Sequence, residues 1–327
     1  MSTRDKLVEL LATTEEFVSG AELARHLGIS RNAVWKHVEV LRGEGWDVET
    51  RHARGYRIVG RPDPMDADEL TRLLSTRWLG RRLVCVPSTG STSNDVAALA
   101  RDGAPEGAVV IADTQTAGRG RLGRTWASAR GVNLYMSVLL RPRVLPAAAP
   151  QLSLVAGLAV ARALEGEGLR PRIKWPNDVL LDGRKVCGIL TELEAEADRV
   201  AFVVVGIGVN LNSRLEHFPA ELHDKATSVF LATGRTVARA AFAARLLEEL
   251  ERCYGRYIEA GFGVLADDWN ARSALTGRTV TVTGAARDPV VGRCTGIDGD
   301  GALLVSDGSA VQRVLAGDVT IVGGYDA

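Results

Sequence analysis

Residues 114–128 read TQTAGRGRLGRTWAS and contain GRGRLG, a match to the G-x-G-x-x-G pattern of dinucleotide-binding loops. Such a loop follows a strand directly, opens a helix and is followed by an acid about twenty residues later. Here DTQTA separates the strand-like GAVVIAD from Gly118, no helical periodicity follows Gly123, and LLRPRVLP lies where the acid belongs. A Rossmann fold is therefore rejected. A kinase and a P-loop protein fail as well, because H-R-D, D-F-G and the dipeptide Gly-Lys are missing.

The arginines of this segment indicate a different use. Arg119, Arg121 and Arg124 alternate with glycines. Like charges at this density do not pack into a core, and glycine is costly to order. Arginine forks bind phosphate or carboxylate bidentately, so we expect a loop that is mobile until it closes over an anion. A solvated surface loop is the alternative.

Length and composition set the frame for the rest of the chain. With 327 residues, 46% of them hydrophobic, two or three domains are expected. Forty Lys and Arg balance forty Asp and Glu, so any binding of nucleic acid depends on a local patch. The cysteines show no C-x-x-C spacing, which indicates buried free thiols. A charged start, MSTRDKLVEL, and apolar runs that we judge too short for a bilayer predict a cytoplasmic protein without membrane contact.

Residues 18–45 show the spacing of a helix-turn-helix. Ser19 and Ser30 are suited to cap two helices, and Gly28 separates them. The strands expected in WDVETRHARGYRIVG (46–60) surround a basic turn and form a wing. We expect DNA contacts from the second helix and the wing, although winged helices also dock proteins. The predicted DNA-binding residues are Ser30, Arg31, Asn32, Lys36 and Arg54.

Three further segments carry a resemblance to a known family. GRGRLGRTW, KWPNDVLLDGRKVCGILTE (174–192) and VVVGIGVNLN (203–212) are similar, in this order, to the biotin protein ligases. With the winged helix, residues 1–325 resemble the bifunctional biotin ligases that also repress the biotin operon. The resemblance implies formation of biotinyl-5'-AMP from biotin, ATP and Mg²⁺. It also implies transfer of biotin to a lysine of the biotin carboxyl carrier protein of acetyl-CoA carboxylase, and operator binding as an adenylate-loaded homodimer.

The resemblance also assigns roles around the nucleotide. Activation brings the biotin carboxylate to the α-phosphate, and two anions that meet require fixed cations. Lys185, Arg119 and Arg121 are implied as the catalytic cations, with the two arginines closing over biotin and the adenylate. The implied ATP-binding residues are Arg121, Arg124 (on phosphates), Trp126 (on adenine), Lys174, Asn177, Asp178 and Asn210. Asp178 is either a Mg²⁺ ligand or a base, and KWPND by itself also reads as a turn held by Pro176.

The ureido ring of biotin requires neutral donors and acceptors. By the resemblance, GSTSNDVA (90–97) supplies them. The implied biotin-binding residues are Thr92, Ser93, Asn94, Gln115, Gly118, Arg119, Gly120, Arg121, Lys185 and Gly188. A second register uses Ser91 with Thr92, and a purely structural reading has Ser93 and Asn94 capping the helix NDVAALAR.

The order of elements predicts an α+β architecture with three domains. A winged helix (1–60) and a linker, GRPDPMDADE, precede a mixed-sheet catalytic domain (66–273). Short strands in 274–327 are similar to the small SH3-like barrel of the family. A lipoate or octanoate ligase is one competing interpretation, although its glycine-and-histidine element is missing. A ligand-sensing repressor without ligase activity is the other, and the intact arginines and Lys185 disfavour it.

Overall fold

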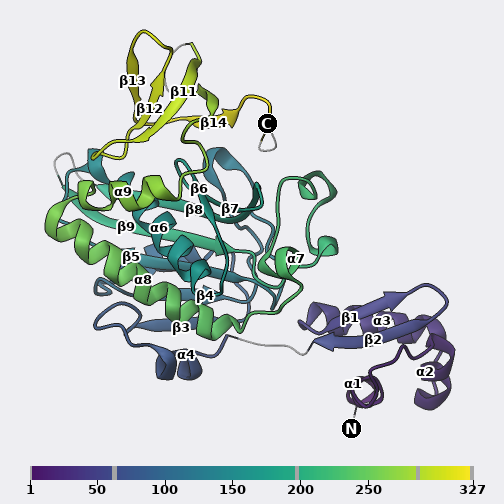
Figure 1. Ribbon diagram of the computed structural model, residues 1–327. Coiled ribbons are helices and arrows are strands. Elements are labelled where there is room, and N and C mark those ends of the chain that lie inside the picture. Colours follow the sequence, from purple (N-terminus) through teal and green to yellow (C-terminus); the bar gives the residue numbers. More distant parts are fainter. Residues whose placement is uncertain (1, 61–64, 196–198, 285–287, 325–327) are drawn as a thin grey trace. The chain divides into compact units, whose positions relative to one another are not determined.

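The computed structural model describes residues 2–60, 65–195, 199–284 and 288–324. They divide into two compact units, the second beginning at Met65. Residues 61–64 of the predicted linker lie outside the described residues. The elements of the first unit are α1 (Thr3–Ala12), α2 (Gly20–Leu27), α3 (Arg31–Gly43), β1 (Asp47–Arg51) and β2 (Gly55–Gly60) (Figure 1).

The first unit is a winged helix, as the sequence predicts. Ser19 and Ser30 accept hydrogen bonds from the first turns of α2 and α3, and Gly28 ends α2 in the left-handed conformation. One face of α3 is buried against α1 and α2, and the opposite face is solvent-exposed at Arg31 and Lys36. Strands β1 and β2 pair antiparallel and form the wing.

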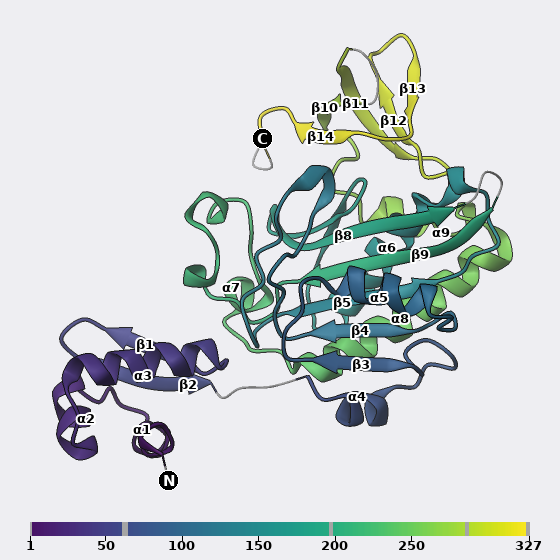
Figure 2. The same ribbon diagram turned by 180° about the vertical axis from the view of Figure 1, so that it is seen from behind.

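The second unit is built on a seven-stranded mixed sheet of order β3-β4-β5-β9-β8-β7-β6 (Figure 2). Only β3 and β4 run parallel, and α5 connects them. The other neighbouring strands are antiparallel. The strands are β3 (Leu83–Val86), β4 (Val109–Ala112), β5 (Leu134–Leu140), β6 (Arg172–Lys174), β7 (Asp178–Leu181), β8 (Arg184–Ala195) and β9 (Val200–Val209).

Helices cover both faces of this sheet. α5 packs on β4, β5 and β9, whereas α6 and α8 pack together against the other face (Figures 1 and 2). α5 starts two residues before the predicted Asn94, and its N-cap, Ser91, makes no side-chain capping bond, so capping by Ser93 or Asn94 does not occur. The helices are α4 (Ala67–Leu73), α5 (Thr92–Arg101), α6 (Gln151–Glu165), α7 (Val229–Thr233), α8 (Arg239–Ala260) and α9 (Gly263–Ala271).

Our expectation about apolar runs is wrong for one helix. Pro146–Glu165 is long and apolar enough to cross a membrane by length and composition. Its most apolar window is 72% buried within the protein, because α6 is the central helix of the hydrophobic core. All four cysteines are free thiols as expected, but only Cys187, Cys253 and Cys294 are buried, whereas Cys85 is half-buried. Burial raises the pKa of Cys253 to about 11.

The C-terminal strands form a second sheet that shares the core of the central one. It is antiparallel, of order β13-β12-β11-β10-β14. Within the described residues β13 and β14 remain its edges, so hydrogen bonds do not close the expected SH3-like barrel. Trp175 Nε1 donates to the carbonyl of Gly301 at 3.1 Å and fastens this sheet to the central one. The strands are β10 (Thr279–Thr283), β11 (Val290–Ile297), β12 (Leu303–Ser306), β13 (Val311–Val314) and β14 (Asp318–Ile321).

A buried ion pair fastens α8 to the end of β4. Arg239 is fully buried, and its Nη2 lies 2.9 Å from Asp113 Oδ1. The same carboxylate oxygen accepts from the amide of Met65, and Arg239 also donates to the carbonyl of Asn133. A buried charge of this kind is tolerated only when it is paired and hydrogen-bonded. The ion pair therefore fixes the end of β4, which precedes the glycine-arginine loop.

Candidate active site

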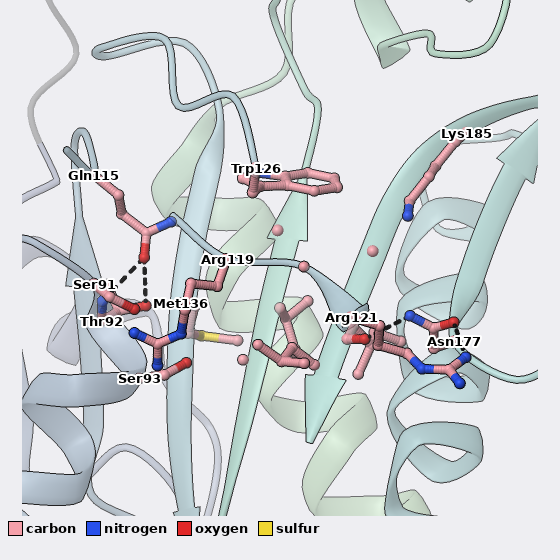
Figure 3. Close-up of a pocket in the computed structure, with 17 residues that line it drawn as sticks. Ser91, Thr92, Ser93, Gln115, Arg119, Arg121, Trp126, Met136, Asn177 and Lys185 are labelled. Atoms are coloured by element: carbon pink, nitrogen blue, oxygen red, sulfur yellow. Dashed lines mark hydrogen bonds between the residues drawn. The ribbon is translucent and has the colours of Figure 1, made fainter. Parts of the chain in front are cut away.

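The segment Gly118–Trp126, hereafter the Arg loop, folds back on itself. The amide of Trp126 donates to the carbonyl of Gly118 at 2.9 Å, and that of Gly120 donates to Arg124 at 2.7 Å. This backbone pairing turns Arg119 and Arg121 in different directions. Figure 3 shows Arg119 near Ser93 and Met136, and Arg121 beside Asn177.

Arg119 is held at the outer edge of the site. Its Nη2 donates to Asn94 Oδ1 at 2.8 Å and lies 2.9 Å from Glu192 Oε1 on β8. Asn94 is exposed and does not line the narrow cavity that Ser91, Thr92 and Ser93 share. The structure thus places this predicted biotin ligand next to Arg119, outside the cavity.

Neutral polar groups gather at one end of the site. Gln115 Oε1 accepts from the amide of Thr92 at 3.0 Å and from its hydroxyl at 3.1 Å. The Thr92 hydroxyl is also 2.7 Å from that of Ser137, which lies 3.1 Å from Ser93 Oγ. Ser91, Thr92 and Ser93 all line the narrow cavity of about 50 Å³, and Gln115 faces them (Figure 3). The arrangement offers uncharged donors and acceptors to a polar ring.

Glycines on β8 and β9 make room for Trp126. Gly188 and Gly208 are register partners, and an added Cβ would lie 2.7 Å and 2.6 Å, respectively, from the indole. No side chain larger than hydrogen fits beneath the ring at either position. Lys185 Nζ lies 5.4 Å from the indole centroid, within range of a cation–π contact. Trp126 and Lys185 therefore form one wall of the site.

The cationic end lies beyond this wall, around a wider cavity of about 790 Å³. Lys185 Nζ is 2.6 Å from Asp178 Oδ1. Burial lowers the pKa of Lys174 below its usual value, and Asp178 partly opposes that shift. The charged residues that line the wider cavity are Arg121, Arg124, Lys174, Lys185, Lys225, Asp178 and Asp318.

The KWPND segment supplies the junction between the two cavities. It is the turn between β6 and β7, with a cis bond before Pro176, so its structural reading is correct as far as the backbone goes. Asn177 Oδ1 accepts from Arg121 Nη1 at 3.1 Å, and its Nδ2 donates to the carbonyl of Ile189. Asn177 consequently holds Arg121 between the cavities. Asn210 also lines the wider cavity, and its side-chain Nδ2 donates to the backbone carbonyl of Thr227.

Several residues of the site escaped the sequence analysis, Lys225 of the wider cavity among them. Ser137 and Glu192 carry no local signal, because their partners are far away in the chain. Asp318 belongs to the C-terminal sheet, and its Oδ2 lies 2.6 Å from Arg124 Nη2. Gly208 could have been predicted, because Gly206 and Gly208 are two positions apart on one strand and therefore lie on the same face.

The site can hold a neutral polar ring at one end and an anion at the other. These properties define a protein that binds a small polar molecule next to a phosphate-bearing one.

Comparison with known proteins identifies the class. Residues 85–210 match the model of the biotin/lipoate A/B protein ligase family. Residues 3–57 match a helix-turn-helix domain, and 276–322 match the biotin protein ligase C-terminal domain. Bifunctional ligase/repressor BirA of Bacillus spizizenii is 39% identical over 97% of this chain and 98% of its own. The Escherichia coli protein of the same name is 33% identical over 97% and 96%.

A solved structure agrees with these matches. The biotin protein ligase of Aquifex aeolicus, in complex with biotin and ATP, superposes with a TM-score of 0.64 at 29% identity. The match covers 74% of this chain and 99% of that one. The chain belongs to the biotin protein ligase family. The chain contains all three matched segments: the helix-turn-helix, the ligase domain and the C-terminal domain. The bifunctional ligase/repressor relative matches nearly the whole chain, which includes all three.

Proposed function

We propose that this chain forms biotinyl-5'-AMP from biotin and ATP and transfers biotin to a lysine of a biotin carboxyl carrier protein. One observation carries the proposal: five residues line both cavities and form a shared wall. A ring bound at the hydroxyl end directs its carboxylate to this wall, and a nucleotide in the wider cavity directs its α-phosphate there. The shared residues are Gly120, Arg121, Trp126, Asn177 and Lys185.

The shared wall explains the first step. A carboxylate oxygen bonds to the α-phosphorus while the bond to pyrophosphate breaks, which concentrates negative charge at the junction. Lys185 and Arg121 are fixed there by Asp178 and Asn177, respectively, so their charges require little reorganisation. Arg124 and Lys174 line the wider cavity, and we assign them to the phosphates of the nucleotide.

The second step requires no nucleophile from this chain. The amine of the carrier lysine attacks the acyl carbon, and AMP leaves with the oxygen that joined it to biotin. The acyl adenylate is reactive toward water, so the Arg loop and Trp126 have to exclude water between the two steps.

Mg²⁺ fits this site as a companion of ATP. Among the described residues no cluster of three or more His, Cys, Asp or Glu side chains is suited to hold a metal. Mg²⁺ commonly binds through one or two carboxylates together with substrate phosphates. Asp178 is the carboxylate that would hold it, and the ion would screen the phosphate charge. Since Lys185 already pairs with Asp178, a role as base is less well supported.

The acid substrate is tested by pyrophosphate-dependent ATP exchange with biotin, lipoate or octanoate supplied in turn. We expect exchange with biotin alone, because two relatives that match 78% and 72% of this chain are named biotin--[acetyl-CoA-carboxylase] ligases. Exchange with lipoate instead would replace the substrate assignment. Absence of exchange with all three acids would favour a ligand-sensing repressor.

We also propose that the winged helix binds operator DNA when an adenylate-loaded homodimer forms. Cations without an acidic partner support this, because within the described part of the chain Arg31, Lys36 and Arg54 form no ion pair, whereas Arg42 and Arg57 pair with acids of the same unit. Ser30 caps α3 at the end that would face phosphate, and Asn32 is exposed beside it. Footprinting on biotin-gene promoters, with and without biotin and ATP, tests the proposal. No protection in either condition would refute it.

We further propose that the winged helix, the catalytic domain and the C-terminal domain span residues 1–60, 66–273 and 274–327, respectively. We also propose that the protein is located in the cytoplasm. A carboxylase subunit is the proposed carrier. The transfer is tested by incubating the carrier with this chain, biotin and ATP. Biotin attached to the carrier is then detected with streptavidin on a blot.

A further inference from the structure

Asp318 connects the C-terminal sheet to the Arg loop. It begins β14, and its Oδ2 lies 2.6 Å from Arg124 Nη2 while its Oδ1 lies 3.6 Å from Arg121 Nη1. The carbonyl of the preceding Gly317 accepts from Arg121 Nη2 at 3.3 Å. Two of the three loop arginines are thus held from a segment nearly two hundred positions later in the chain.

The carboxylate of Asp318 serves the loop and not its own sheet. Among the described residues its side chain forms ion pairs with the two loop arginines, whereas its backbone carbonyl accepts from Thr283 Oγ1 of the neighbouring strand. β14 pairs with β10 through its backbone from Thr283↔Asp318 onward. An amide in place of the carboxylate would therefore leave the sheet intact.

The charges of the wider cavity give this contact a second consequence. Five cations and two acids line it, and each acid lies against a cation that the proposed function assigns to the nucleotide. The side chain of Arg124 is 68% exposed, so Asp318 is what directs it toward the cavity. A carboxylate in this position attracts the arginines and repels phosphate.

We propose that Asp318 is a positioning residue that tethers the Arg loop over the adenylate. The inference rests on the proposed function. The tether slows escape of biotinyl-5'-AMP, and the same negative charge weakens ATP binding. A residue that only supported the fold would not change these two quantities in opposite senses.

The test uses the full chain with Asp318→Asn, and Asp300→Asn as the matched control. Asp300 pairs with Arg313 on the same sheet, and neither residue lines the two cavities described above. KM for ATP is measured by pyrophosphate exchange, and release of labelled biotinyl-5'-AMP is measured after dilution into unlabelled adenylate. We expect Asp318→Asn to release adenylate about 2- to 5-fold faster and to lower KM for ATP by about 2-fold, within the range of exposed ion pairs. Asp300→Asn should match the parent.

A second variant separates the tether from general damage. Arg124→Gln breaks the same ion pair from the loop side and should also speed release, but it should raise KM for ATP because a phosphate-side cation is lost. The double variant should release no faster than the faster single variant, since both remove one interaction. Parent-like release by Asp318→Asn, or additive effects in the double variant, would overturn the proposal. Failure of the proposed function is distinguishable, because the parent itself would then show no biotin-dependent exchange.

Discussion

The glycine beneath Trp126 allows a sharp test of the site. In Gly208→Ala the new Cβ would lie 2.6 Å from Trp126 Cε2, 2.7 Å from Nε1 and 2.8 Å from Cζ2. These distances are far below van der Waals contact, so the indole has to leave its place on the sheet. Overpacking of this kind costs about 1–3 kcal/mol. If the whole cost falls on ligand binding, affinity decreases by about 5- to 150-fold, since about 1.4 kcal/mol corresponds to tenfold.

The loss should appear in the KM values for biotin and ATP in pyrophosphate exchange, because Trp126 lines both cavities. The melting temperature should change little, since the indole belongs to a loop and not to the core. Gly255→Ala in α8 is the matched control, because its Cβ would meet nothing within 4 Å.

A second substitution identifies the cause. Trp126→Ala removes the indole that collides with the new methyl group, so adding Gly208→Ala to Trp126→Ala should raise the KM values no further. Parent-like KM values in Gly208→Ala would refute the reasoning. So would a further loss in the double variant relative to Trp126→Ala, because the damage would then not arise from the indole.

Four further outcomes follow from the site and the core. Arg121→Ala should lose bound adenylate faster than it loses ATP affinity; equal adenylate retention in filter binding would contradict this. The affinity for ATP should be highest at pH values where Lys174 is charged and should decline as pH rises through its lowered pKa. In Lys174→Arg the affinity for ATP, measured by calorimetry, should depend less on pH. Asp113→Ala should destabilise by about 3–5 kcal/mol, as expected for an uncompensated buried Arg239; a urea midpoint equal to the parent's would disprove the account. Lys36→Ala should reduce the slope of log K against log salt for operator DNA by about 1, and an unchanged slope would remove Lys36 from the interface.

Much of the local structure was predictable because it depends on neighbours in sequence. Caps at Ser19 and Ser30, the left-handed Gly28 and the wing follow from side-chain bonds and turns that span only a few residues. The rejection of a Rossmann loop was also a local argument, and the observed sheet with only one parallel pair agrees with it.

The precise start of α5 was not predictable in the same way. The purely structural reading of the sequence has Ser93 and Asn94 capping a helix NDVAALAR. In the structure Thr92 and Ser93 face inward, where they meet Gln115 and Ser137. Bonds to Ser137 on β5 and to Gln115 outweigh the local capping preference, and no local pattern predicts them.

By itself the sequence determined the winged helix, the order of the α+β elements and the presence of a loop rich in arginine and glycine, because each depends on short-range periodicity, caps or composition. Only the tertiary structure decided which groups meet. The register of β8 and β9 sets Gly188 against Gly208 beneath Trp126, and packing of the C-terminal sheet brings Asp318 to Arg124. Contacts between distant segments depend on strand register and on the packing of sheets, which are properties of the whole fold.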